Sequence, residues 1–186
     1  MAKIHERIDG RLRQFIERQH VFFVATAPRD GGHANVSPKG VDGTFAVIDE
    51  LTVGYLDITA SGAETIAHVR ENGRITVMFC AFDGPPNVVR LHGCGRVVTV
   101  YDEAYADLAG RFSETRGARA VIVVDVERVS DSGGFGVPRM QHAGEREILI
   151  ERTGRQDDEA LATYRRTKNQ VSIDGLPAFD FNPPAG

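Results

Sequence analysis

The sequence predicts a mainly β fold, a small closed barrel with short flanking α-helices. Segments of strand length that are rich in β-branched and aromatic residues recur along the 186 residues. Gly93 and Gly95 interrupt the longest of them, as a bend at a barrel corner requires. A hydrophobic content of 41% suits one sizeable core. We therefore expect one barrel of about six strands.

The first elements are a helix and a hairpin. Apolar residues at three- and four-residue spacing predict an amphipathic helix over residues 3–19. The apolar run 21–27 predicts a buried strand, and the turn residues after it lead to a return strand over 35–37. We expect this strand to end at Pro38, which has no N–H for a central ladder.

A second pair of strands and a helix follow. Alternating residues predict strands over 45–48 and 51–56 that continue a meander. Ser61 and Glu64 have the spacing of a capping box, in which each residue satisfies a free N–H of the other. They predict a helix start at Ser61, and Gly73 predicts its end.

The second half alternates strands with helices. Apolar runs that are rich in β-branched residues predict three strands, whereas residues 102–112 and 157–168 show helical spacing. The predicted strands are 74–82, 88–100 and 120–126.

Charge and cysteine usage exclude several classes of protein. The formal net charge is −4 and the lysines and arginines are scattered, so we expect no nucleic-acid partner. No apolar run approaches the roughly 18 residues of a membrane span, and we expect a cytoplasmic protein with no membrane partner. Cys80 and Cys94 form no CxxC pattern, which favours buried, reduced thiols.

Metal and dinucleotide sites are also not expected. The six histidines show no HxxxH or HxH pairing, so we predict no metal ligands. The glycines around Gly93 and over residues 133–136 do not open a helix of a βαβ unit, as a dinucleotide fingerprint would.

Polar residues gather ahead of the predicted helix start. Lys39 lies between a proline and a glycine, where its ammonium is either a phosphate or flavin contact or a solvated loop lysine. Ser61 and Thr65 flank a helix N-terminus, whose free N–H groups favour an anion, although a capping box alone also explains Ser61. Arg74 and Arg90 each need an anionic partner, either a ligand or a carboxylate of this or a second subunit.

The order of these segments resembles the pyridoxamine 5'-phosphate oxidase-like, FMN-binding split-barrel family. The likeness covers roughly residues 18–129 and runs through VFFVATA, NVSPKG, FAVIDELTVGYLD, SGAETIAHVRENGRITVMF and VVRLHGCGRVV. It implies a six-stranded split barrel and a homodimer that binds FMN in the cleft between its subunits.

The resemblance also assigns cofactor contacts. The segment with Asn35, Ser37 and Lys39 matches the one that contacts the flavin ring and phosphate. The strand from Tyr55 to Asp57 matches the one that lines the ring, and residues 61–65 match the phosphate-binding helix start. The nine residues expected to hold FMN are Asn35, Ser37, Lys39, Tyr55, Asp57, Ser61, Thr65, Arg74 and Arg90.

The chain departs from the true oxidases at this helix start. They have an arginine and a lysine where this sequence has Glu64 and Thr65, so we do not expect vitamin B6 oxidase activity. The resemblance implies an FMN-dependent oxidoreductase of an unknown small-molecule substrate. The alternative is a non-catalytic protein that binds a flavin, a deazaflavin or haem.

The expected organisation has two parts. Residues 1–129 form the flavin-binding split barrel with its N-terminal helix. Residues 130–186 form a C-terminal extension, made of a loop, a helix and a tail, that packs on the same domain.

Overall fold

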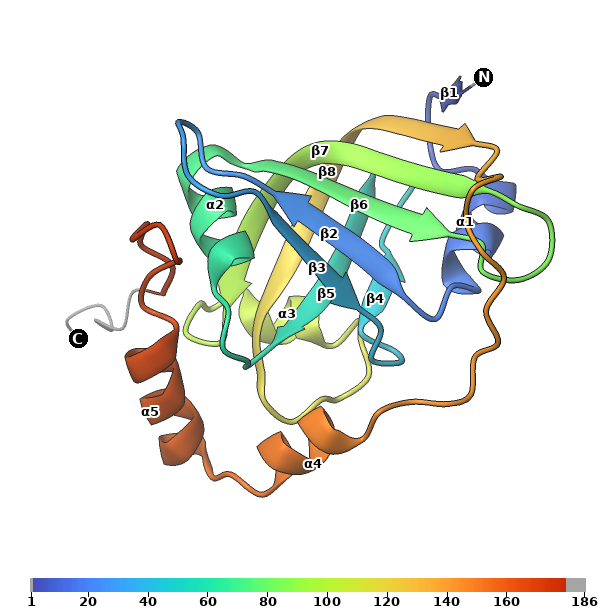
Figure 1. Ribbon diagram of the computed structural model, residues 1–186. Helices are drawn as coiled ribbons and strands as arrows, with labels where there is room; N and C mark the ends of the chain where they lie inside the picture. The colour runs from blue at the N-terminus through green and yellow to red at the C-terminus, as the bar shows by residue number, and fades with distance from the viewer. Residues whose placement is uncertain (1, 180–186) are drawn as a thin grey trace.

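A curled antiparallel sheet forms the body of the computed structural model, which describes residues 2–179 (Figure 1). Its strands are β1 Lys3–His5, β2 Phe22–Thr26, β3 Asn35–Lys39, β4 Phe45–Val47, β5 Thr52–Ile58, β6 Arg74–Cys80, β7 Val88–Thr99 and β8 Ala118–Ser132. They follow the order β3-β2-β6-β7-β8-β5-β4, and β1 pairs with β8. The mainly β fold is therefore confirmed. The expected six strands become eight, of which β1 and β4 have three residues each.

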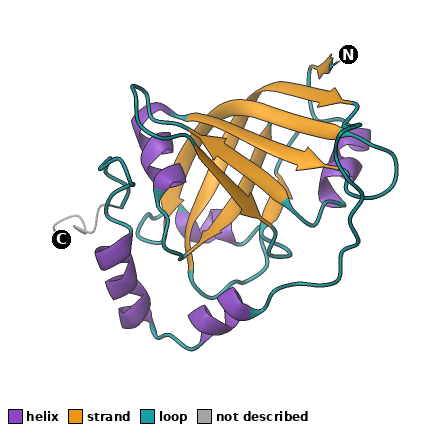
Figure 2. Cartoon of the chain, viewed as in Figure 1, coloured by secondary structure: helices purple, strands orange, loops and turns teal. Residues whose placement is uncertain are grey.

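Within residues 2–179, five helices flank the sheet. Figure 2 shows the helices in purple around the orange strands. They are α1 Gly10–Glu17, α2 Glu64–Asn72, α3 Tyr105–Ala109, α4 Ile148–Gly154 and α5 Asp158–Lys168. In Figure 1, α1 and α2 lie at opposite ends of the barrel. Both bury apolar side chains in the main core, among them Leu12 and Ile16 of α1 and Ile66 of α2.

An aromatic group fills the barrel interior. Phe22 contacts Phe45, Tyr55 and Phe79, with ring centroids 5.0–5.7 Å apart. Tyr55 and Phe79 are at most 1% exposed. Residues i and i+2 of a strand share a face, so Asp57 must enter the same interior as Tyr55.

The predicted bend in the longest strand is confirmed. The register between β7 and β8 shifts between His92 and Gly93. A Cβ at Gly93 would run into the backbone of Asp125 on the neighbouring strand. Only glycine permits this close approach, and the sheet curls there.

The predicted helix over residues 3–19 is wrong in its first half. Residues Lys3–His5 extend the sheet by pairing with β8, and α1 begins at Gly10. Asp9 is its N-cap, with a side chain that accepts a hydrogen bond from the N–H of Leu12 at 2.8 Å. The apolar spacing typical of a helix extends upstream of the N-cap. The residues before the cap nevertheless pair with β8, so the helix does not include them.

The predicted end of the return strand is also wrong. β3 runs through Pro38 to Lys39, because β3 is an edge strand and needs no N–H on its open side. The predicted meander is wrong as well, since β3 and β4 lie at opposite ends of the strand order.

The capping box at Ser61 does not form. Ala63 is the N-cap of α2, without a side-chain hydrogen bond, and Glu64 is the first helical residue. The predicted stop at Gly73 is confirmed by its left-handed backbone, with a φ of 73°. The predicted burial of Cys80 is confirmed, whereas Cys94 is exposed because it lies on the outer face of β7.

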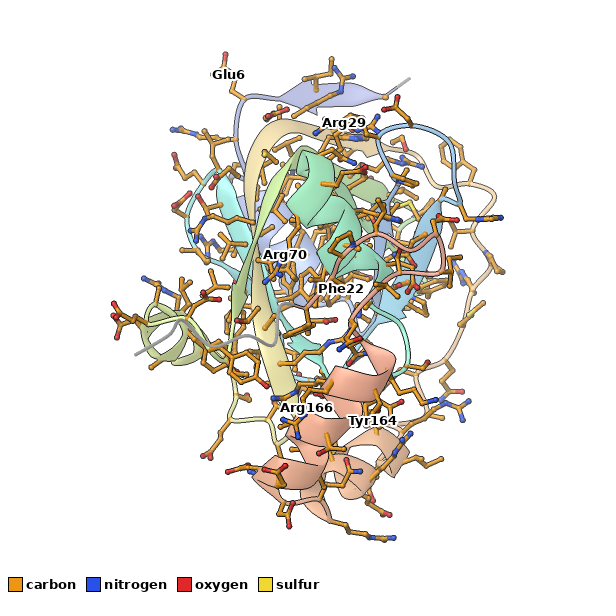
Figure 3. The ribbon with its side chains drawn as sticks, turned by 90° about the vertical axis from the view of Figure 1, so that its left-hand side faces the viewer. Glu6, Phe22, Arg29, Arg70, Tyr164 and Arg166 are labelled. Carbon is orange, nitrogen blue, oxygen red and sulfur yellow. The ribbon has the colours of Figure 1, made fainter. Side chains whose placement is uncertain are left out.

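Helix α5 contacts the loop that follows β5. Asp157 caps α5, which buries Leu161 and Arg165, and the Nε of Arg165 donates to Thr59 Oγ1 at 3.1 Å. Figure 3 shows α5 with its labelled Tyr164 and Arg166 below α2. The division at residue 129 stays a prediction, and the end of the predicted tail, residues 180–186, lies outside the described residues.

Candidate functional site

The inward face of β3 supplies three half-buried polar side chains, Asn35, Ser37 and Lys39. Alternation along the strand sends Val36 and Pro38 to solvent and these three inward. The Nδ2 of Asn35 donates to Thr65 Oγ1 on α2 at 3.1 Å, and Ser37 Oγ donates to Asn35 Oδ1 at 3.1 Å. The edge strand is thereby joined to the start of α2.

A buried carboxylate lies between two cations. Asp57 is 1% exposed, and its oxygens accept from Lys39 Nζ at 2.8 Å and Arg119 Nε at 2.7 Å. Burial by itself raises the pKa of the Asp57 carboxyl, but Arg119 and Lys39 outweigh burial and lower it to about 2. The three groups therefore carry a formal charge of +1, and the carboxylate is ionised at neutral pH.

Arg119 occupies a β-bulge. Asp57 pairs with Ala120 and Ile58 with Ala118, so Arg119 is the extra residue that the bulge turns inward. It is 3% exposed and also donates to the carbonyl oxygens of Ala60 at 3.3 Å and Gly62 at 2.6 Å. One guanidinium thus fixes both the carboxylate and the loop that leads into α2.

Sequence reasoning missed Arg119, because the predicted strand began at Ala120, the residue after it. The usable signal was an arginine at the edge of the apolar run AVIVV, since a buried guanidinium requires an anionic partner. Thr26, which contacts the buried His68 of α2, was missed as well. His68 Nδ1 lies 3.0 Å from Thr26 Oγ1, and burial lowers the pKa of His68, which keeps it neutral.

Tyr55 joins the two halves of the site. Lys39 Nζ lies 5.9 Å from the centre of its ring, while its hydroxyl faces Thr65 without a hydrogen bond of regular geometry. Burial, followed by the charge of Asp57, raises the pKa of Tyr55 well above its usual value of 10. Tyr55 therefore remains a neutral phenol with a donor to spare.

Replacing Tyr55 by Phe is expected to leave the free energy of unfolding unchanged or to raise it by up to about 1 kcal/mol. The substitution removes a buried hydroxyl that has no regular partner among the described residues. Urea unfolding of the two proteins measures the difference. A loss of more than about 2 kcal/mol would mean that the hydroxyl makes a strong hydrogen bond in solution.

The structure thus brings together six of the nine predicted residues, namely Asn35, Ser37, Lys39, Tyr55, Asp57 and Thr65. The other three take part in none of these contacts. Ser61 is exposed, and its carbonyl oxygen accepts from Asn169 at 3.4 Å. Arg74 donates to the carbonyl oxygen of Pro28 at 3.0 Å, and Arg90 donates to Ser132 Oγ at 3.2 Å. In these hydrogen bonds both arginines donate to neutral oxygens, whereas an anionic partner was expected for each.

The C-terminal extension covers the start of α2. Asn169 donates to the carbonyl oxygen of Ala60 at 2.9 Å, and the N–H of Ile173 donates to Glu64 Oε1 at 3.3 Å. The carboxylate of Glu64 is therefore turned toward the extension. Residues of the C-terminal extension therefore lie beside the free N–H groups at the start of α2.

A groove lies elsewhere, at the end of the barrel beside α1. It has a volume of about 760 Å³ and reaches from the aromatic group of the core to the loop at residues 40–43. None of the nine predicted cofactor residues lines it. Within residues 2–179, no helix has the length and apolar character to cross a membrane.

Comparison with known proteins gives consistent matches. The family described as pyridoxamine 5'-phosphate oxidase matches residues 8–133. A pyridoxamine 5'-phosphate oxidase family protein of Aspergillus flavus, ustO, is 40% identical over 197 residues, which cover 96% of this chain and 78% of that protein.

Solved structures match this chain at lower identity. HupZ of Group A Streptococcus is 23% identical, with a TM-score of 0.52 over 72% of this chain and 99% of that chain. An FAD binding protein of Mycobacterium smegmatis is 16% identical, with a TM-score of 0.48 over 68% and 95%. The likeness to HupZ supports the barrel fold alone.

Proposed function

Because the chain belongs to the pyridoxamine 5'-phosphate oxidase family, we propose that it is an FMN-binding oxidoreductase that acts on a small organic molecule. The observation that carries this proposal is the cluster on β3, β5 and α2. It combines a partly exposed ammonium and two half-buried polar side chains on an edge strand, with the buried ring of Tyr55 beneath the ammonium. This donor set fits the anionic part of a phosphorylated cofactor.

Lys39 is the group best placed to meet the cofactor. Its side chain is 25% exposed, and one of its three donors is used on Asp57. Arg119, at 4% side-chain exposure, is committed to Asp57 and two carbonyl oxygens. In the proposed complex Lys39 binds the phosphate or the edge of the flavin, and Asn35 and Ser37 orient the bound cofactor. Bound flavin supplies hydride transfer, while the protein supplies orientation and electrostatics.

A homodimer is part of the proposal. The outer face of β2, β3 and β6 carries an apolar patch, with Val36 64% exposed beside exposed Pro38 and half-buried Phe23 and Met78. A second subunit on this face would cover the cluster's edge strand and complete a cofactor cleft. Such a contact is favourable because it removes apolar surface from water. The free thiols of Cys80 and Cys94 suit the reducing cytoplasm that we propose as its location.

Replacing Lys39 by Met is expected to weaken FMN binding by at least about tenfold, since a charge-assisted contact contributes about 1.5–3 kcal/mol. Quenching of FMN fluorescence on titration measures the affinity. Lys168→Met is the matched control, because Lys168 is exposed on α5, away from the cluster. Unchanged affinity in Lys39→Met would remove Lys39 from the cofactor site.

The purified protein tests the cofactor itself. We expect absorbance near about 450 nm, the band of oxidised flavin, and FMN by mass spectrometry of the released ligand. A Soret band instead would overturn FMN and identify haem. The mass of a deazaflavin would likewise overturn FMN and identify a deazaflavin as the cofactor.

A second candidate is a non-catalytic protein that holds the cofactor. The observation that favours it is the pairing within the cluster, where Lys39, Asp57 and Arg119 are bound to one another rather than poised for proton transfer. Rapid mixing with NADH and NADPH distinguishes the two. Reduction of the bound flavin supports the oxidoreductase, whereas a flavin that neither cofactor reduces supports the binding protein.

A further inference from the structure

Two histidines and a glutamate from distant parts of the sequence meet on the surface. His20 lies between α1 and β2, while His142 and Glu145 lie in the segment between β8 and α4. Their potential ligand atoms are all within 4.8 Å of one another. We propose that these three residues bind a divalent transition-metal ion of the Zn²⁺ type.

The donor set fits such an ion. Two imidazole nitrogens and one carboxylate oxygen, with a further position open to water, are a ligand set that Zn²⁺ takes in proteins. Two ligands that are 2.0–2.1 Å from a tetrahedral ion lie about 3.3 Å apart. His142 Nε2 and Glu145 Oε1 are already 3.5 Å apart, and all three residues are exposed. A metal ion lies in the plane of each imidazole that binds it, so the two rings, which are nearly parallel, must both turn to aim a nitrogen at one ion. Both side chains are exposed and can change rotamer in this way.

The backbone holds His20 in place. The N–H of Gln19 bonds to the carbonyl oxygen of Ile16 at the end of α1, and β2 begins at Phe22. On the other side, a Cβ at Gly40 would lie 2.6 Å from the carbonyl oxygen of His20, so the loop at 40–43 packs directly on this residue. His20 thus projects from a rigid junction.

The segment that carries the other two ligands is anchored at both ends. The N–H of Met140 donates to the carbonyl oxygen of Phe82 at 2.9 Å, and α4 begins at Ile148. Between these points the chain has no helix or strand, and Figure 1 shows it passing beside α1 on its way to α4. The rings of His142 and His20 stack with centroids 3.8 Å apart and an interplanar angle of 7°. A bound ion would fasten this segment to the barrel.

The surroundings favour a cation. His20 and Glu145 line the groove of about 760 Å³, and His142 lines the adjoining hollow. Carboxylates outnumber arginines in the lining of the groove: Glu17, Asp42, Asp83 and Glu145 against Arg11 and Arg18. The proposed ion therefore lies at the mouth of a negatively charged groove, with its open position available to water or to a ligand. Sequence spacing could not reveal this, since only His142 and Glu145 are close in sequence.

Calorimetric titration of the full, untagged chain with Zn²⁺ at about pH 7.5, where histidine is mostly neutral, tests the site. We expect one ion per chain. His20→Ala and His142→Ala should each weaken binding by at least about thirtyfold, and Glu145→Gln by about tenfold. His33→Ala is the matched control, because it removes an exposed imidazole that is paired with Asp174, away from the site. It should bind Zn²⁺ as the wild type does.

Proteolysis tests the fastening of the segment. Arg139 and Arg146 are exposed on either side of His142 and Glu145. Zn²⁺ should slow tryptic cleavage after both arginines at least about fivefold in the wild type, and should have no effect in His142→Ala. Absence of saturable binding below about 100 µM Zn²⁺, or equal weakening by His33→Ala, would overturn the site. Zn²⁺ binding that does not slow tryptic cleavage would show that the ion does not fasten the segment to the barrel.

Discussion

Replacing Asp57 by Ala is expected to lower the free energy of unfolding by about 3–5 kcal/mol, the cost of leaving buried cations without their partner. Asp57 is 1% exposed and accepts from both Lys39 and Arg119. Arg119 cannot escape to solvent, because its own side chain is 4% exposed. Urea unfolding monitored by circular dichroism measures the change.

The pH dependence gives an independent check on the same residue. The pKa of Asp57 is about 2 in the folded protein, below its usual value of 3.8. A lowered folded-state pKa stabilises the protein above the unfolded pKa and loses this effect as the pH falls through the folded one. Asp57 should therefore contribute about 2 kcal/mol that disappears between about pH 4 and pH 2.

Two variants control this prediction. Asp57→Asn keeps the shape of the side chain and should abolish its part of the acid-dependent loss. Asp158→Asn alters an exposed carboxylate that pairs with Arg116, and should change stability by less than about 0.5 kcal/mol. If Asp57→Asn unfolds with the same acid dependence as the wild type, the buried pairing is not present in solution.

Replacing Arg119 by Met should cost a comparable amount, about 3–5 kcal/mol. The change leaves Asp57 with Lys39 as its single cation, removes the donor to the carbonyl oxygen of Gly62 and leaves that of Ala60 with Asn169. Arg119→Lys should recover only part of the loss, because an ammonium cannot reproduce the three directed bonds of the guanidinium. Chemical unfolding of the three proteins gives the comparison.

A double-mutant cycle separates the pair from its surroundings. Asp57→Asn combined with Arg119→Met should cost at least about 1.5 kcal/mol less than the sum of the single changes, because the two side chains share hydrogen bonds. Strict additivity would show that Arg119 acts through the loop carbonyls alone. The cofactor titration of the double variant then reports whether this loop affects FMN binding.

Local patterns predicted the strands well. Apolar runs bounded by turn residues placed the ends of β2, β4, β5, β6 and β7 within two residues of those observed. Gly73 and the glycine bend in β7 followed from backbone requirements that are intrinsic to glycine. These features depend on neighbours along the chain, so the sequence contains their signal.

Local patterns gave wrong predictions where the structure depends on long-range pairing. Helical spacing over residues 3–19 could not reveal that β1 adds to the edge of β8. The rule against proline in strands failed at Pro38, because its application depends on whether the strand lies at an edge. Spacing also suggested a capping box at Ser61, where the loop carbonyls are instead held by Arg119 and Asn169.

The sequence by itself determined a mainly β barrel, the family likeness and a polar strand end at Asn35, Ser37 and Lys39. The tertiary structure decided which charges meet. A β-bulge turned Arg119 onto Asp57, and the packing of a distant segment brought His142 to His20. Periodicity reports which face a residue occupies, but the meeting of two faces depends on strand order and chain path, which no local pattern contains.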